Sequence, residues 1–301
     1  MTSGKVSVVI TTYNRIVELE RAIKSVLDQT YSNIELIIID DNDDARISKI
    51  VAEMSCSYGA VYKKNTVNLG GALSRNEGIK LANGEYIAFL DDDDEYLPLK
   101  IEKQVELFEK SKVEKLGVVY CYAKAVNEKG EVVEIHRNDI RGNYMFENML
   151  NIVAATSQWL CLKSAVLNMG GFRDVPSKQD TTFLMDMALS GYHIDFVPEV
   201  LSIYHESDIE RISTLSIKNL SGELILRENM REHYNLFTEK QIKMIEYNRA
   251  WHIYYKQIRL GLFKDSDKSI KDLIKNNQIG IKLLPVLLKH PLRRIIKPKI
   301  R

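Results

Sequence analysis

The sequence predicts an α/β fold in which a mostly parallel central sheet lies between helices. Three apolar segments, 6–10, 34–39 and 85–90, have the length of buried strands, and the first of them is rich in β-branched residues. An amphipathic stretch follows the first of them, and Asn14 is predicted to cap a helix that runs to Thr30. Apolar strands that alternate with amphipathic helices indicate a parallel sheet covered on both faces.

The other predicted elements continue this alternation to about residue 94 and then follow a looser pattern. The remaining predicted strands are 60–62, 118–126, 132–135 and a run that ends at 162. The remaining predicted helices are 47–54, 70–81, 98–112 and 179–190. After residue 213 the pattern is helical, so we expect a main domain, 1–210, and a helical C-terminal extension, 211–301.

The composition excludes several classes of protein. With 45% hydrophobic and 28% charged residues, the 301-residue chain has the balance of an ordinary globular protein. Three scattered cysteines are too few for a disulfide framework or a zinc site. The first ten residues lack a signal-peptide pattern, and no apolar run reaches the roughly 18 residues of a membrane span. We therefore expect a cytoplasmic protein.

Charge is unevenly distributed, although the net charge is only +1. From Lys256 onward 13 Lys and Arg face 3 Asp, a net charge of +10, so the first 255 residues carry −9. Within this basic part, 279–301 interleaves basic and apolar residues. Such a segment suits either the surface of an anionic membrane or a helix packed on the protein with its lysines in water. We expect no nucleic-acid partner.

Polar clusters follow three of the predicted strands. Residues 40–44 read Asp-Asp-Asn-Asp-Asp, residues 91–94 are four aspartates, and 11–14 read Thr-Thr-Tyr-Asn. In open parallel sheets, ligands bind at the carboxyl ends of the strands. These three clusters are therefore expected at one edge of the sheet, where Tyr13 offers an aromatic face for stacking a base.

The four aspartates at 91–94 indicate a divalent cation. Like charges this close raise one another's pKa unless a cation compensates them, and Mg²⁺ and Mn²⁺ prefer oxygen ligands. The alternative is a solvated acidic turn. A calcium loop is excluded because its sixth position holds Tyr96 instead of glycine. A phosphatase with an aspartyl nucleophile fits poorly, because Glu95 stands where a small hydroxyl or aliphatic residue is expected.

A Gly-Gly pair at 70–71 lies between the two acidic clusters and begins a predicted helix. Glycine permits close backbone approach, and the N-terminus of a helix favours anions. On its own this pair is more often just a turn. Neither a P-loop nor a dinucleotide-binding glycine pattern is present.

Together, segments 6–15, 35–42 and 68–94 resemble the family-2 glycosyltransferases of the GT-A fold, in sequence and in order. The resemblance covers about residues 4–210. It implies a donor half at about 1–95 and an acceptor half at about 96–210. The residues that it places in the donor nucleotide site are Thr11, Tyr13, Asp41, Asn68, Arg75, Asp91 and Asp92.

The resemblance also implies what several of these residues do. Thr11 and Tyr13 would hold the base and ribose, and Asp41 would read a uracil-like ring edge. In the family's Asp-x-Asp motif, Asp93 would bind Mn²⁺ or Mg²⁺. Asp91 and Asp92 would contact ribose, sugar or metal-bound water.

Two further residues come from later motifs. Gly170-Gly171-Phe172 followed by Gln179-Asp180 resembles the region that supplies the catalytic base, with Gln179 in place of the usual Glu. Asp180 would then take the proton of the acceptor. His205 would be an additional metal or diphosphate ligand, or else a structural histidine.

The implied activity is inverting transfer of a sugar from a nucleotide-diphosphate donor, best matched by UDP, to a hydroxyl. The implied acceptor is a glycan or a polyprenyl-diphosphate-linked saccharide. One rival is a sugar-phosphate nucleotidyltransferase, which would need an N-terminal Gly-rich loop that is absent. Another is a non-catalytic module that binds nucleotide sugars, which would not need both the aspartate cluster and Asp180.

Overall fold

The computed structural model describes residues 4–206 and 215–276, and these form two compact units. The sheet unit comprises the described residues of 4–145, 152–174 and 180–206. The helical unit comprises those of 146–151, 175–179 and 215–276. The basic segment 279–301 lies outside the described residues.

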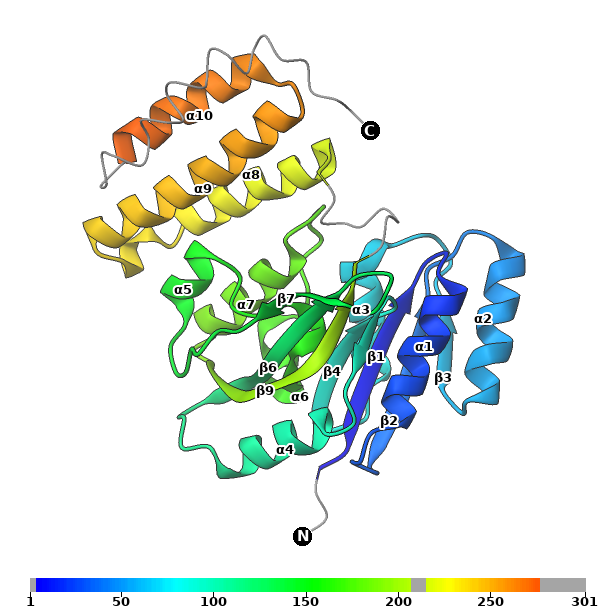
Figure 1. Ribbon diagram of the computed structural model, residues 1–301. Coiled ribbons are helices and arrows are strands. Elements are labelled where there is room, and N and C mark those ends of the chain that lie inside the picture. The colour runs from blue at the N-terminus through cyan, green and yellow to red at the C-terminus, as the bar shows by residue number, and fades with distance from the viewer. Residues whose placement is uncertain (1–3, 207–214, 277–301) are drawn as a thin grey trace. The chain divides into compact units, whose positions relative to one another are not determined.

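The sheet unit is built on a nine-stranded sheet in the order β3-β2-β1-β4-β8-β6-β9-β5, with β7 paired to β6 (Figure 1). Its strands are β1 (Val6–Thr12), β2 (Ile34–Asp40), β3 (Val61–Lys64), β4 (Tyr86–Asp91), β5 (Asp94–Tyr96), β6 (Leu116–Val126), β7 (Val132–His136), β8 (Leu160–Leu162) and β9 (His193–His205).

The parallel arrangement predicted for the first strands is confirmed, whereas the second half of the sheet is mixed. Strands β3, β2, β1 and β4 are mutually parallel. Beyond them, β8 is antiparallel to both β4 and β6, and β9 is parallel to β6 but antiparallel to β5. The predicted β6–β7 hairpin is present.

Helices cover both faces of this sheet. They are α1 (Ile16–Leu27), α2 (Ala45–Ser57), α3 (Gly70–Leu81), α4 (Lys100–Lys110), α6 (Lys163–Met169) and α7 (Gln179–Leu189). Side chains of α1, α2 and α4 pack on one face, where β1 contributes Val8 and Ile10. Side chains of α3, α6 and α7 pack on the other, where β1 contributes Val9. Because successive side chains of a strand point to opposite faces of the sheet, β1 contributes to the hydrophobic core on each face.

The predicted cap of the first helix is wrong. Helix α1 begins at Ile16 after the N-cap residue Arg15, which makes no side-chain capping bond, and it ends at Leu27. Asn14 instead has a positive φ of 58°. Its N–H donates to Oδ1 of Asn42 at 2.6 Å, so the backbone turns here to connect two strand ends.

The helical unit contains nearly all of α5 (Met145–Leu150), together with α8 (Ile217–Arg231), α9 (Glu239–Arg259) and α10 (Phe263–Asn276). Thr238 begins α9 with a capping box, in which its hydroxyl and the side chain of Gln241 satisfy each other's N–H groups. A small apolar core joins α9 to α10. Among the helices of the two described ranges, none is long and apolar enough to cross a membrane.

A short segment before α7 is bound to α8 within the helical unit. The Ser177 hydroxyl donates to the carbonyl of Asn219 at 3.2 Å. A Cβ at Gly222 would lie 2.0 Å from the Ser177 oxygen, so only glycine permits this approach. Next to it, Lys178 forms an ion pair with the fully buried Glu223.

Candidate functional site

The three polar clusters lie at one edge of the sheet, as the sequence predicts. The parallel register places Thr11 beside both Ile39 and Asp91, and Thr12 beside Asp40. Strands β1, β2 and β4 therefore end at the same level, and the chain leaves each of them through polar residues. The Tyr13 N–H donates to Oδ2 of Asp92 at 3.3 Å, which links the first cluster to the third.

Asp41 is buried and connects β2 to the start of α3. Its two carboxylate oxygens accept the N–H groups of Leu69 and Gly70, each at 2.8 Å. The Asn68 side chain donates to the Asp41 carbonyl at 3.2 Å. A base edge read by Asp41 would have to share these oxygens with the first turn of the helix.

Tyr13 is 44% exposed, and its ring is thus available for stacking. Its hydroxyl donates to Oδ2 of Asp43 at 3.4 Å. Asp43 belongs to the predicted cluster but was not among the candidate site residues. Its position in the loop between Asp41 and α2 is the signal that could have identified it.

Arginines compensate the charges of the 91–94 turn. The Arg15 guanidinium is 2.9 Å from Asp92 and 3.2 Å from Asp93. Arg75 of α3 forms an ion pair with Asp91. Arg75 is among the residues predicted for the site, whereas Arg15 is not, although it directly follows the Thr-Thr-Tyr-Asn loop.

Burial raises the pKa of Asp92 to about 6. The Arg15 charge opposes this rise, and the neighbouring charge of Asp93 adds to it. A single arginine thus leaves the pair of carboxylates short of positive charge. An additional cation at this turn would be electrostatically favourable.

The donor chemistry of this turn suits a hard divalent cation. Asp91, with a side chain that is 36% exposed, and Asp93 offer carboxylate oxygens, the ligands that Mg²⁺ and Mn²⁺ prefer. No set of three or more His, Cys, Asp and Glu residues in the described ranges is already gathered as a metal cage. This arrangement fits a metal that is shared with substrate phosphates.

His205 lies at the end of β9 and is bound to Glu95 of β5 through its Nε2 atom. The same carboxylate is 3.3 Å from Arg21. A metal ligand role for His205 would require exchange of the bond to Glu95.

Asp180 lies in the first turn of α7, where its Oδ1 accepts the N–H of Thr181 at 2.7 Å. Burial raises the pKa of the Tyr204 phenol, and the charges of Asp94, Asp91 and Asp180 raise it further. The charge of Asp180 therefore acts on the same phenol as the charges of Asp91 and Asp94, although Asp180 belongs to α7 and not to the turn.

The Gly-Gly-Phe turn is bound to α3. Asn76 donates to the Phe172 carbonyl and accepts its N–H, both at 2.8 Å. Gly171 has a φ of 78°, and a Cβ there would lie 2.6 Å from the Asn76 oxygen. The Arg75 guanidinium lies 5.4 Å from the centre of the Phe172 ring. Helix α3 therefore contacts both the 91–94 turn, through Arg75, and the Gly-Gly-Phe turn that precedes Asp180, through Asn76.

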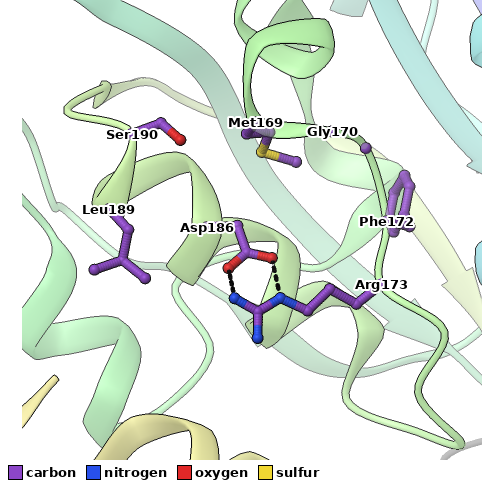
Figure 2. Close-up of a pocket in the computed structure, with 8 residues that line it drawn as sticks. Met169, Gly170, Phe172, Arg173, Asp186, Leu189 and Ser190 are labelled. Atoms are coloured by element: carbon purple, nitrogen blue, oxygen red, sulfur yellow. Dashed lines mark hydrogen bonds and ion pairs between the residues drawn. The ribbon is translucent and has the colours of Figure 1, made fainter. Parts of the chain in front are cut away.

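An open pocket of about 450 Å³ lies beside the Gly-Gly-Phe turn, between the end of α6 and the last part of α7 (Figure 2). Arg173 and Asp186 form a two-point ion pair in its wall, as the dashed lines in Figure 2 show. The pocket does not include the strand-end clusters, so it is distinct from the predicted donor site.

Known proteins share this sequence pattern. The family model described as glycosyl transferase family 2 matches residues 7–164. An uncharacterized glycosyltransferase of Haemophilus influenzae is 27% identical over 281 residues, 90% of each chain. An Escherichia coli protein named UDP-Glc:alpha-D-GlcNAc-diphosphoundecaprenol beta-1,3-glucosyltransferase is 39% identical over 128 residues, 42% of this chain and 49% of that protein.

Solved structures share the fold at low sequence identity. S. aureus TarS 1-349 in complex with UDP-GlcNAc has a TM-score of 0.69 at 16% identity, covering 97% of this chain and 88% of that one. The mannosyltransferase PcManGT from Pyrobaculum calidifontis, in complex with GDP-Man and Mn²⁺, has a TM-score of 0.59 at 16% identity, covering 99% and 82%. Because the family model covers more than half of the sequence and these structures share its architecture, the chain belongs to the family-2 glycosyltransferases and has their GT-A fold.

Proposed function

We propose that this glycosyltransferase moves a sugar from a nucleotide-diphosphate donor, a UDP-hexose or UDP-N-acetylhexosamine, to a hydroxyl of a glycan or lipid-linked saccharide, with inversion. The supporting observation is the meeting of β1, β2 and β4 at one edge, with Tyr13 hydrogen-bonded to Asp92. The UDP-GlcNAc complex of TarS and the name of the E. coli relative support the choice of donor and acceptor class.

In this proposal the donor site combines residues from all three clusters. Thr11 and Tyr13 hold the base and ribose, and Asp41 with Asn68 shapes the loop that faces the base. Arg75, Asp91 and Asp92 face the diphosphate and sugar. A bound Mn²⁺ or Mg²⁺, held by Asp93 and Asp91, would supply positive charge to the diphosphate. The Mn²⁺ in the PcManGT complex supports this assignment.

The chain's own base in the reaction is Asp180. As the acceptor hydroxyl oxygen bonds to the anomeric carbon, the bond from that carbon to the diphosphate oxygen breaks, and the diphosphate leaves with the electron pair. The hydroxyl proton passes to the carboxylate of Asp180. Arg75 lies beside Asp91 and contributes positive charge on the donor side. One displacement of this kind inverts the anomeric configuration without a covalent enzyme intermediate.

The proposal also places the enzyme at the inner face of the cell membrane, through the basic segment 279–301. Each Lys or Arg near an anionic surface contributes about 1 kcal/mol, so binding should weaken steeply with salt. Co-sedimentation of liposomes with the full chain and with a version ending at Asn277 tests this. Equal, salt-independent behaviour of the two would contradict it.

The decisive experiment is a screen of nucleotide sugars for release of free nucleoside diphosphate, with Mn²⁺ and with excess chelator. We expect metal-dependent release from a UDP-sugar, faster with acceptor. A nucleotidyltransferase would instead form pyrophosphate from a nucleoside triphosphate and a sugar phosphate. A non-catalytic module would bind the nucleotide sugar and release nothing.

A further inference from the structure

A single buried hydroxyl joins the two ends of the 91–94 turn. Ser157 Oγ accepts the N–H of Asp91 at 3.2 Å and donates to Oδ2 of Asp94 at 2.6 Å. Ser157 lies in the 3-10 turn η1 (Thr156–Gln158), more than sixty residues along the chain from either partner. Its side chain therefore sets the distance between the last residue of β4 and the first residue of β5.

The segment that carries Ser157 is itself held firmly. Three successive backbone carbonyls of this segment accept hydrogen bonds from buried side chains. Ser202 donates to the Ser157 carbonyl at 2.9 Å, Gln104 to the Gln158 carbonyl at 2.8 Å, and Lys100 to the Trp159 carbonyl at 3.3 Å. The three donors belong to α4 and β9, and all are completely buried. A backbone fixed at three consecutive carbonyls has little freedom to move the hydroxyl.

The four aspartates of the turn consequently differ in their surroundings. Asp91, Asp92 and Asp93 pair with arginines that approach from α3 and from the loop before α1. Asp94 accepts the Ser157 hydroxyl and lies in β5, opposite Tyr204 of β9. The first three carboxylates thus face arginines, whereas the fourth accepts the hydroxyl of a buried serine.

We propose that Ser157 is a positioning residue for donor binding, and that Asp94 anchors the turn instead of touching the donor or the metal. This inference rests on the proposed function, because it assumes that a nucleotide binds at the turn. Without the hydroxyl, the Asp91 N–H and the Asp94 carboxylate each lose a partner in a buried place, and the turn relaxes. Asp91 and Asp93 would then no longer be held at the spacing that the donor requires.

The test measures nucleotide affinity by calorimetry with UDP, dTDP and GDP in excess Mn²⁺, and continues with the nucleotide that the wild type binds. Ser157→Ala should raise the Kd about tenfold, as expected for loss of a hydrogen bond to a charged group. The donor KM should rise by a similar factor, while kcat changes less. Ser55→Ala is the matched control, because this serine is equally buried and bonds only the Val51 carbonyl within α2.

A double-mutant cycle tests the route through Asp94. If Ser157 acts on the turn through this carboxylate, Ser157→Ala combined with Asp94→Ala should bind nucleotide no more weakly than the worse single variant, within about twofold. If the two increases in Kd multiply, Ser157 does not act through Asp94. Should Ser157→Ala fail to fold, Ser202→Ala removes the donor to the Ser157 carbonyl and should raise the Kd about threefold.

The outcomes separate the inference from the function on which it rests. If the wild type binds none of the three nucleotides, the proposed function itself fails. If the wild type binds and Ser157→Ala matches Ser55→Ala in Kd and KM, only the inference fails. A lowered melting temperature with an unchanged Kd would also overturn it, because the hydroxyl would then only stabilise the fold.

Discussion

Asp92 in the sheet unit and Glu223 in the helical unit are both buried carboxylates, yet their surroundings shift their pKa in opposite directions. Asp92 has one arginine at 2.9 Å and another aspartate next to it, and its pKa is raised to about 6. Glu223 is surrounded by Arg249 at 3.0 Å, Lys256 at 2.7 Å and Lys178 at 3.6 Å. Burial would raise the pKa of Glu223, but these three cations lower it to about 2.

The difference lies in the number of cations for each carboxylate. The helical unit supplies more positive than negative charge around Glu223, so the network is complete without a ligand. The 91–94 turn carries more carboxylates than its two arginines compensate, and a ligand with positive charge would complete it. The local charge deficit at the turn supports the proposed metal site there, although the two ion networks are built from the same residue types.

Removing a carboxylate charge from the 91–94 turn should have the largest effect, a loss of turnover. Asp93→Asn keeps the shape but removes a ligand of the proposed metal, so turnover should fall about a thousandfold while the fold is retained. Turnover is measured as nucleoside diphosphate release in excess Mn²⁺. Asp195→Asn is the control, a buried and ion-paired aspartate near the start of β9. Full wild-type activity in excess chelator would contradict the metal assignment.

The second largest effect is expected at Asp180, the proposed base, which is not part of the 91–94 turn. Asp180→Asn should bind donor and Mn²⁺ normally and transfer sugar at least about a hundredfold more slowly, because the variant cannot accept the acceptor proton. Single-turnover transfer and calorimetry of donor binding measure the two effects separately. Asp186→Asn lies on the same helix in its ion pair with Arg173 and serves as the control. A larger loss in Asp186→Asn than in Asp180→Asn would show that the base is misassigned.

In the complete network, loss of charge should reduce stability rather than activity. Glu223→Gln leaves the buried Arg249 and the partly buried Lys178 and Lys256 without their carboxylate. It should lower the free energy of unfolding by about 2 kcal/mol, measured by urea denaturation. The pKa of Glu223 is lower in the folded chain than its ordinary value of 4.5. The wild-type advantage should therefore be complete above pH 4.5 and disappear as the pH falls towards 2.

Glu228→Gln is the matched control for this variant, on the same helix. Glu228 is exposed and pairs with Arg231 one turn away, so its loss should change stability by no more than about 0.5 kcal/mol. Equal effects of the two substitutions would mean that burial does not distinguish these networks.

The smallest effect concerns Lys100, a buried cation that contacts neutral groups. Lys100 donates to the Gln104 oxygen at 2.8 Å and lies 3.9 Å from the centre of the Tyr96 ring. Burial lowers its pKa from 10.5 to about 8. Between these values the unfolded chain binds more protons, so stability should rise with pH.

The test compares the wild type with Lys100→Met in urea denaturation between pH 8 and pH 10. As the pH rises, the unfolding free energy of the wild type should increase relative to that of Lys100→Met by roughly 1 kcal/mol per pH unit. Lys110→Met, an exposed position on the same helix, corrects for general effects of pH. A constant difference would mean that Lys100 keeps its ordinary pKa.

The part of this molecule that the sequence predicts best is the part where local pattern and tertiary structure agree. Strands β1, β2 and β4 are continuously apolar because helices cover both faces, and their polar ends meet because parallel strands share an edge. Strand β5 was missed because Asp94-Glu95-Tyr96 shows no apolar alternation. Strand β9 was missed because Pro198 and Glu199 interrupt its pattern where its register with β6 shifts.

The partners of the site residues could not be predicted in the same way. Asp91 to Asp94 form one run in the sequence, and only the arrival of Arg15, Arg75 and Ser157 from distant segments makes them different from one another. Repulsion between the four charges indicated a need for cations. It did not reveal that arginines supply part of this charge.

Helix α3 has a consequence for the order in which substrates bind. Its first turn is bound by Asp41, its Arg75 pairs with Asp91, and its Asn76 holds Phe172 through two hydrogen bonds. In the proposed site, this one helix thus contacts the nucleotide side at two points and the acceptor side at a third. A donor that draws on Arg75 also sets the turn leading to Asp180, so the enzyme should follow an ordered kinetic scheme with the donor first and the nucleoside diphosphate as the last product to leave.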